Sequence, residues 1–341
     1  MKVARLTAPF KIEFEDAPIP EINDNQVLLK ILCFGVCASD QQIYHGKHKY
    51  AAMPVVMGHE VAAKVEKVGA NVTDFKVGDK VTVQPQVTCG ECYPCLQGRF
   101  NVCEHLKVIG VHMDGCNCEY VALEPKYLHH ITADIPDEQI ALAEPLAVGV
   151  GSITRSQRFK GNNVVVVGAG TIGNCVAQAA KQLGAGKVMV TDINQAKLDY
   201  ALECGIDYAI NTKDITLKEA IEKTFGLQKA DVIVDCVAHP MVFKSILEAA
   251  RPNSDIILTG NYKEPCDFEV PLVQRREINL LGHMMYDREA FAEAVRLLCE
   301  GKITTSKTIS QIFPFEKYPE AFVFADEHPN DVMKMIIKVS E

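Results

Sequence analysis

Four cysteines lie close together in the segment CGECYPCLQGRFNVC, at the spacing CxxCxxCx7C; they are Cys89, Cys92, Cys95 and Cys103. Two-residue gaps let successive thiolates turn toward one centre, and the longer gap returns a fourth, which completes the tetrahedral sulfur shell of a zinc ion. An iron–sulfur cluster, which usually has a different last gap, and unrelated thiols are the alternatives. We predict a structural zinc in a lobe at about residues 86–106. With four protein ligands it has no open position for chemistry.

A second group that could do chemistry consists of Cys37, in GVCASD, and of His59 and Glu60, in GHE. A cysteine, a histidine and a carboxylate can bind zinc and still leave one position open for water or substrate. Taken alone, a cysteine and a histidine this far apart in the sequence are better explained as unrelated residues. Their interpretation therefore depends on the motifs around them.

A glycine loop, GAGTIG, contains Gly168, Gly170, Ile172 and Gly173 and follows the apolar run VVVV. In a dinucleotide fold the first glycine makes a tight turn, the second admits the pyrophosphate, and the third allows the helix to pack on the strand. A glycine turn in an ordinary α/β unit is the alternative. However, Asp192 ends the next apolar run, where a carboxylate can accept hydrogen bonds from ribose hydroxyls. Because a 2′-phosphate would meet like charge there, we predict NAD rather than NADP.

The elements that must position these residues change in character along the chain. Short Val- and Ile-rich segments between turn residues, such as 26–32 and 61–68, predict a mostly β half before residue 155. From residue 162, apolar runs alternate with helical patterns, which predicts a parallel sheet with helices on both faces. An amphipathic helix from about residue 287 precedes short mixed segments.

Composition narrows the class of protein. The chain has 341 residues, of which 48% are hydrophobic and 23% charged, so we expect a folded protein of about two domains. Its net charge of −9 argues against nucleic acid as a partner, and its apolar runs are too short to cross a membrane. The N-terminal segment has no apolar signal core, so we expect a cytoplasmic protein whose thirteen cysteines are reduced.

The order of the motifs resembles the zinc-dependent medium-chain dehydrogenase/reductase family over essentially the whole chain. That order is Cys37, GHE, the four-cysteine lobe, AEPLA at 143–147 and GAGTIG. Within the family, the chain is most similar to polyol dehydrogenases of the sorbitol type and to L-threonine 3-dehydrogenases. The resemblance implies an α/β protein with a GroES-like β-barrel catalytic domain (1–154), a Rossmann doubly wound parallel-sheet domain (155–288) and a C-terminal return to the catalytic domain (289–341).

The resemblance also implies a site. Cys37, His59 and Glu60 would hold a catalytic zinc, with Glu144 as a fourth ligand or beside the bound water. The other implied roles are for Asp40, which would fix the ring of His59, Ser39, which would contact the substrate oxygen, Lys197, at the adenosine ribose, and Tyr44 and Tyr286, near the substrate. A solvated helix lysine and a packed tyrosine are the alternatives for Lys197 and Tyr44.

The implied activity is hydride transfer to NAD from a secondary alcohol of a polyol, sugar or sugar acid, with two zinc ions per chain and a homodimer or homotetramer as the assembly. The alternatives are L-threonine 3-dehydrogenase-like oxidation of an amino alcohol and a zinc- and NAD-binding regulatory protein without catalysis. The chain departs from the family pattern at Gln42, which replaces a relay histidine, at Gly151, which also replaces a histidine, and at Met285, which replaces an arginine. His45 is one candidate to take over the relay, and a path through ribose and water is the alternative.

Overall fold

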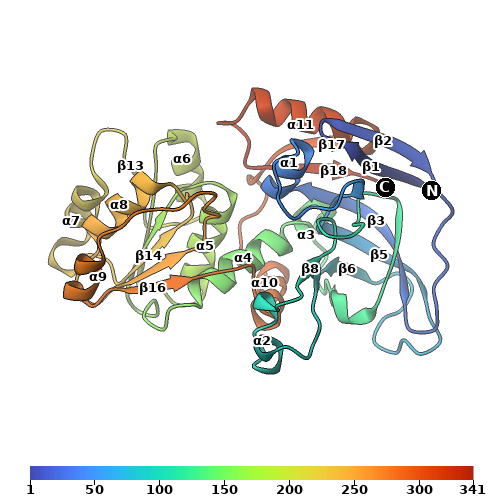
Figure 1. Ribbon diagram of the computed structural model, residues 1–341, viewed down its shortest axis with the longest axis horizontal. Helices are drawn as coiled ribbons and strands as arrows, with labels where there is room; N and C mark the ends of the chain where they lie inside the picture. The colour runs from blue at the N-terminus through green and yellow to red at the C-terminus, as the bar shows by residue number, and fades with distance from the viewer. Residues whose placement is uncertain (341) are drawn as a thin grey trace. The chain divides into compact units, whose positions relative to one another are not determined.

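The computed structural model describes residues 1–340, which divide into two compact units. The first unit contains Met1–Glu144, Leu298–Gly301 and the chain from Thr305 onward, and the second contains Pro145–Leu297 and Lys302–Thr304 (Figure 1). The predicted boundary at residue 154 falls at the end of helix α4 (Ala143–Ile153), whereas the compact units separate near its start. The predicted domain bounds stay a prediction.

The first unit is mostly β. Its strands are β1 (Lys2–Ala8), β2 (Lys11–Asp16), β3 (Val27–Val36), β4 (Val55–Val56), β5 (Glu60–Val68), β6 (Lys80–Val83), β7 (Gln86–Val87), β8 (Lys107–Val108), β9 (Tyr120–Leu123), β10 (Leu128–His130), β17 (Ile309–Pro314) and β18 (Lys334–Lys338). Its helices are α1 (Ala38–Tyr44), α2 (Tyr93–Leu96), α3 (Asp137–Ile140) and α11 (Tyr318–Glu327).

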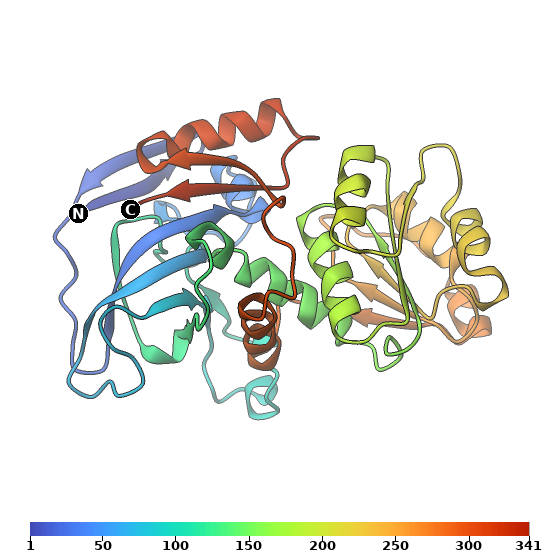
Figure 2. The ribbon, with the colours of Figure 1, turned by 180° about the vertical axis from the view of Figure 1, so that it is seen from behind.

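A seven-stranded sheet organises this unit in the order β10-β6-β5-β3-β18-β17, with β9 also paired to β3. The central strand β3 is apolar and almost wholly buried, as expected of a strand covered on both faces. It pairs antiparallel with β5 on one side, with Gly35 opposite Glu60, and with β18 on the other, with Val36 opposite Met335. The end of the chain therefore returns beside the strand that leads to Cys37 (Figure 2).

The second unit is a doubly wound sheet of six parallel strands in the order β13-β12-β11-β14-β15-β16, with helices on both faces (Figure 1). The strands are β11 (Asn163–Val167), β12 (Lys187–Asp192), β13 (Tyr208–Asn211), β14 (Val232–Asp235), β15 (Asp255–Leu258) and β16 (Asn279–Gly282). The helices, besides α4, are α5 (Thr171–Gln182), α6 (Gln195–Glu203), α7 (Leu217–Phe225), α8 (Pro240–Ala249), α9 (Val270–Arg276) and α10 (Arg288–Cys299), whose end belongs to the first unit.

The core of the second unit explains why its helices form. Val165 and Ile233 on the sheet are fully buried against apolar positions of α7 and α8, among them Ile221 and Ile246. Helix α7 begins with a capping box in which Thr216 and Glu219 bond reciprocally. The apolar runs of the sequence therefore become the inner strands, and the helical patterns become their covers. Among the residues described, no helix combines the length and apolar character that a membrane crossing needs.

Candidate active site and metal centres

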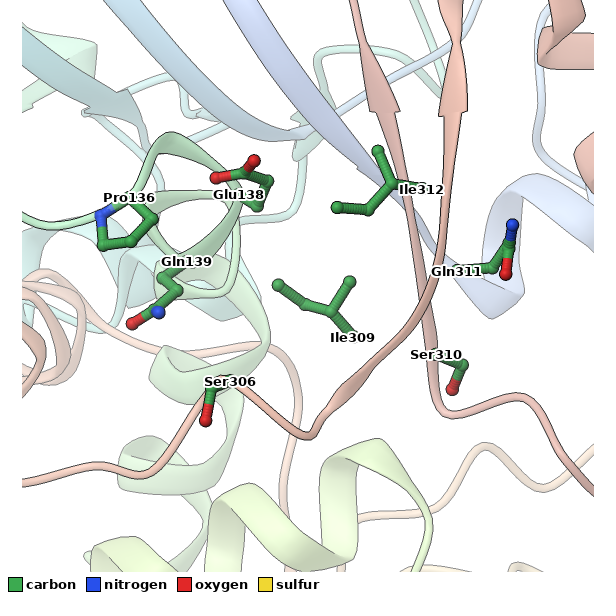
Figure 3. Close-up of a pocket in the computed structure, with 8 residues that line it drawn as sticks. All are labelled: Pro136, Glu138, Gln139, Ser306, Ile309, Ser310, Gln311 and Ile312. Carbon is green, nitrogen blue, oxygen red and sulfur yellow. The ribbon is translucent and has the colours of Figure 1, made fainter.

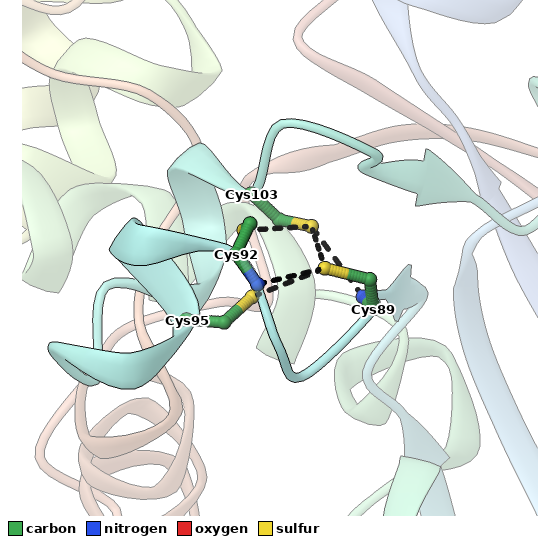
Figure 4. A group of neighbouring side chains, drawn as sticks. All are labelled: Cys89, Cys92, Cys95 and Cys103. Atoms are coloured by element: carbon green, nitrogen blue, oxygen red, sulfur yellow. Dashed lines mark hydrogen bonds between the residues drawn. The ribbon is translucent and has the colours of Figure 1, made fainter.

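The four lobe cysteines converge in the first unit (Figure 4). Their Sγ atoms lie 3.5 Å apart between Cys103 and Cys89, 3.8 Å between Cys92 and Cys103, and 4.0 Å between Cys89 and Cys95. A zinc ion with Zn–S bonds of about 2.3 Å requires sulfur separations of about 3.8 Å in a tetrahedron. These separations are far longer than a disulfide bond. The donor set and its spacing therefore fit a four-sulfur zinc site.

Backbone amides of this lobe donate hydrogen bonds to cysteine sulfur atoms. Hydrogen bonds from the amides of Glu91 and Cys92 lower the pKa of Cys89 to about 6, whereas burial raises the pKa of Cys95 to about 12. The amide of His105 also donates to Cys103 Sγ, at 3.3 Å. Thiolates are the form that binds zinc, so the lowered pKa of Cys89 favours the form that the metal requires.

We expect Cys95→Ala to remove one zinc ion per chain and to lower the melting temperature by at least about 5 °C, because structural zinc stabilises the fold directly. Cys266→Ala, at a half-exposed loop cysteine, is the control and should change neither value. Zinc content and a thermal scan measure both effects. An unchanged zinc content in Cys95→Ala would argue against the lobe as a metal site.

The second predicted group also comes together in the first unit. One ligand atom each of Cys37, His59 and Glu60 lies within 4.8 Å of the others. Cys37 follows β3 and begins α1, while His59 and Glu60 lie at the start of β5. Because β3 and β5 pair antiparallel with Gly35 opposite Glu60, the chain beyond β3 reaches His59. The pairing of two strands thus brings distant residues to one point.

Asp40 and Ser39 lie on opposite sides of the His59 ring. Asp40 Oδ1 is 3.6 Å from Nδ1, and Ser39 Oγ is 3.4 Å from Nε2. Asp40 Oδ2 accepts a hydrogen bond from the Cys37 amide at 3.0 Å, which ties the first turn of α1 to the ring. Burial acts to lower the pKa of His59, but Asp40 and the Cys37 side chain outweigh it and raise that pKa. With Nδ1 turned to Asp40, Nε2 is the nitrogen left for a metal.

Glu60 has a partner that sequence analysis missed. Lys334 Nζ, at the start of β18, lies 2.6 Å from each carboxylate oxygen of Glu60 and 3.3 Å from the Val36 carbonyl oxygen. The two residues are 4% and 1% exposed. Burial alone would lower the pKa of Lys334, but Glu60 outweighs it and raises that pKa. Each carboxylate oxygen keeps a second lone pair, which is available to a metal ion. Glu60 as a zinc ligand stays a prediction.

Glu144 is buried in the first turn of α4, and its charge acts on both His59 and Lys334. It is not one of the three residues whose ligand atoms lie within 4.8 Å of one another in residues 1–340. Glu144 therefore acts on the site through its charge. Its role as a direct zinc ligand stays a prediction.

The predicted substrate contacts are packed side chains. Tyr44 is 6% exposed and stacks on Phe322 of α11, with ring centroids 4.3 Å apart. Tyr286 is 1% exposed, and its Cβ lies 3.1 Å from the position of a Cβ at Gly151. Their contact with substrate stays a prediction. His45 Nε2 lies 2.9 Å from Asp326, so its ring is bonded to α11 rather than to Ser39.

The glycine loop lies in the second unit, where α5 begins at its cap Gly170. A Cβ on Gly173 would lie 1.8 Å from the Gly168 carbonyl oxygen, so the helix could not pack there with any other residue. Gly168 has φ +100°, a conformation that favours glycine. A Cβ on Gly170, in contrast, would meet nothing within 4 Å, which leaves its backbone open to a ligand. Ile172, inside the loop, is half-buried.

Asp192 stands beside this loop at the carboxyl end of β12. Its Oδ2 accepts a hydrogen bond from the Ala169 amide at 2.7 Å, and its Oδ1 accepts one from Asn194 at 2.9 Å. The half-buried Lys197 lies one turn into α6. Two apolar side chains at this edge, Ile193 and Val237, are 71% and 45% exposed, and sequence analysis missed both. Their places, one residue after the apolar run that ends at Asp192 and two residues after the run that ends at Asp235, were the available signal.

A separate cavity of about 370 Å³ lies in the first unit, between α3 and β17 (Figure 3). Glu138, Gln139, Ile309 and Ile312 are among its lining residues. None of the predicted site residues lines it, and it offers a single carboxylate, so we assign it no part in the chemistry.

Comparison with known proteins identifies the family of this chain. Residues 23–133 match the alcohol dehydrogenase GroES-like domain, and residues 171–300 match the zinc-binding dehydrogenase domain. An uncharacterised zinc-type alcohol dehydrogenase-like protein of Haemophilus influenzae is 34% identical over 98% of both chains. The sorbitol dehydrogenase of Bacillus subtilis is 28% identical over 99% of this chain and 97% of its own.

A solved alcohol dehydrogenase of Escherichia coli, complexed with NADH, superposes with a TM-score of 0.92 at 29% identity and covers 99% of each chain. The predicted fold class, a GroES-like domain with a Rossmann domain, is confirmed, and the chain is an oxidoreductase. This protein belongs to the zinc-dependent alcohol dehydrogenases of the medium-chain dehydrogenase/reductase family.

Proposed function

We propose that this protein oxidises a secondary alcohol of a polyol, sugar or sugar acid, with NAD as the hydride acceptor and a zinc ion as the Lewis acid. The convergence of the half-buried Cys37 with the buried His59 and Glu60 is the observation that carries the proposal. Three such ligands would leave a coordination position for substrate, whereas the four-sulfur lobe would leave none. The similarity to a sorbitol dehydrogenase supports the substrate class.

The chain's own residues prepare the site for alcohol oxidation. Cys37, His59 and Glu60, with Glu144 close by, would hold the catalytic zinc, which when bound lowers the pKa of an alcohol toward neutrality. Asp40, whose Oδ1 lies 3.6 Å from Nδ1 of His59, would fix the orientation of that ring. Ser39, whose hydroxyl lies beside Nε2, would receive the substrate proton. Gln42 cannot act as a base at neutral pH, and His45 is bonded to Asp326, so Ser39 would pass the proton outward to water rather than to either side chain.

The glycine loop and Asp192 support NAD as the cofactor. The Asp192 oxygens each accept one amide hydrogen bond and keep a second lone pair for a ribose hydroxyl. A 2′-phosphate at that edge would meet the negative charge of Asp192. Lys197, in the first turn of α6, is proposed as a contact of the same ribose. A homodimer or homotetramer remains our expectation for the assembly.

We expect measurable NAD reduction on at least one member of a panel of polyols, aldonic acids, inositols and threonine. We also expect kcat/KM to be at least about tenfold higher with NAD than with NADP, equivalent to 1.4 kcal/mol. Absorbance of the reduced cofactor measures both. A preference for threonine over every polyol would overturn the substrate class. Zinc-loaded protein that oxidises none of the panel would favour the regulatory alternative.

A further inference from the structure

A buried carboxylate in the second unit has no part in the function proposed so far. Asp235 is the last residue of β14 and is 0% exposed. Its Oδ1 accepts hydrogen bonds from the amides of Val237 at 2.9 Å and Ala238 at 3.1 Å, and its Oδ2 accepts one from the Tyr262 hydroxyl. An ionised carboxylate is costly to bury, and here its donors are neutral groups of two loops. In return, the carboxylate fixes the amides of Val237 and Ala238 in the loop after β14 and the side chain of Tyr262 in the loop after β15.

Asp235 also fixes the loop that follows the neighbouring strand. Its carbonyl oxygen accepts hydrogen bonds from the amides of Thr259 at 3.0 Å and Gly260 at 2.8 Å, directly after β15. Tyr262 lies in the same segment and packs its ring edge-on against Phe243 of α8. One residue therefore joins the loop after β14 to the loop after β15.

The loop after β14 lies against the glycine loop. Asp235 is opposite Val167, the last residue before Gly168, and the Cys236 amide donates to the Val167 carbonyl oxygen at 2.9 Å. A Cβ on Gly168 would lie 2.9 Å from Val237 Cγ2. In doubly wound sheets the ligand crevice opens where the strand order reverses, and here that point lies between β11 and β14. Val237 is therefore an exposed side chain at the dinucleotide crevice.

The conformation of this loop is strained and needs support. Ala238 has φ +59°, which residues other than glycine rarely adopt. Its Cβ would lie only 2.7 Å from a Cβ at Gly260, so the two loops fit only with glycine at 260. The bonds from Asp235 to both loops hold Ala238 in place. Without them the loop has a less strained conformation available.

We propose that Asp235 and Tyr262 are positioning residues that hold residues 236–238 as one wall of the dinucleotide site. Neither side chain has to touch the cofactor, because they act through the placement of Val237 against the glycine loop. The inference rests on the proposed use of NAD and assigns residues to that same site.

Tyr262→Phe tests this inference by removing one hydrogen bond to the buried carboxylate. We expect the Kd for NADH to rise about tenfold, because the loss of this hydrogen bond loosens a loop that must be ordered when the dinucleotide binds. The KM for NAD should rise with it, while kcat at saturating NAD stays within about twofold of wild type. Asp235→Asn should raise the Kd for NADH by a smaller factor in the Tyr262→Phe background than in wild type, because the two residues act as one unit. The chain has no tryptophan, so nicotinamide fluorescence follows binding directly.

Tyr208→Phe is the matched control. Tyr208 lies on the outer strand β13, which β12 and β11 separate from β14. Its ring packs edge-on against Phe225. This variant should leave the Kd for NADH unchanged. A Tyr262→Phe variant that melts earlier but binds NADH like wild type overturns the inference, as does an equal loss in Tyr208→Phe. Wild-type protein that binds neither NADH nor NADPH overturns the proposed function and the inference with it.

Discussion

Cys37→Ser is expected to lower kcat/KM for alcohol oxidation by at least about a thousandfold, which corresponds to about 4 kcal/mol of transition-state stabilisation. Cys37 provides the thiolate of the predicted catalytic site, and its Sγ lies within 4.8 Å of the ligand atoms of His59 and Glu60. A serine hydroxyl remains neutral near pH 7 and binds zinc poorly. Because the four lobe cysteines are untouched, we expect the variant to keep one zinc ion per chain and to lose the other.

Zinc analysis and NAD reduction, measured on the same preparation, check this result. Cys299→Ser is the control, since that half-buried cysteine at the end of α10 belongs to no group of three or more metal-ligating side chains among the described residues. It should retain two zinc ions and full activity. Two retained zinc ions in Cys37→Ser, or activity close to wild type, would contradict the assignment of the catalytic metal to Cys37.

The sequence alone predicted the two metal centres because their residue types are rare and their spacing is informative. Short gaps placed the four lobe cysteines together, and the motif order related Cys37 to His59. The alternation of apolar runs and helical patterns predicted the parallel sheet, since each inner strand is buried on both faces. These inferences depend on local patterns, and the structure has the corresponding elements in that order.

Other site residues could not be predicted because their roles depend on contacts between distant segments. Lys334 opens the run KMIIK and resembles any solvated lysine at a strand end, yet the return of β18 beside β3 buries it against Glu60. Asp192 and Asp235 both end apolar strands and look alike in sequence. The structure leaves Asp192 half-buried beside the glycine loop, whereas it encloses Asp235 between two loops. Such differences come from tertiary packing.

The buried pair of Lys334 and Glu60 makes the strongest prediction for stability. Lys334→Met is expected to destabilise the protein by about 3–5 kcal/mol, because it leaves the buried Glu60 carboxylate without its cation. That loss corresponds to a fall of at least about 6 °C in melting temperature for a unit of this size. Calorimetry measures it. Lys338→Met, at the exposed end of the same strand, is the matched control and should change the melting temperature little.

A double variant separates charge from packing at this pair. Glu60→Gln together with Lys334→Met removes both charges, and we expect it to recover most of the stability that Lys334→Met loses, since a buried ion pair adds little over neutral groups of similar size. A double variant less stable than either single variant would show that Glu60 and Lys334 stabilise the sheet independently of each other. Equal melting temperatures for Lys334→Met and Lys338→Met would contradict the buried pair itself.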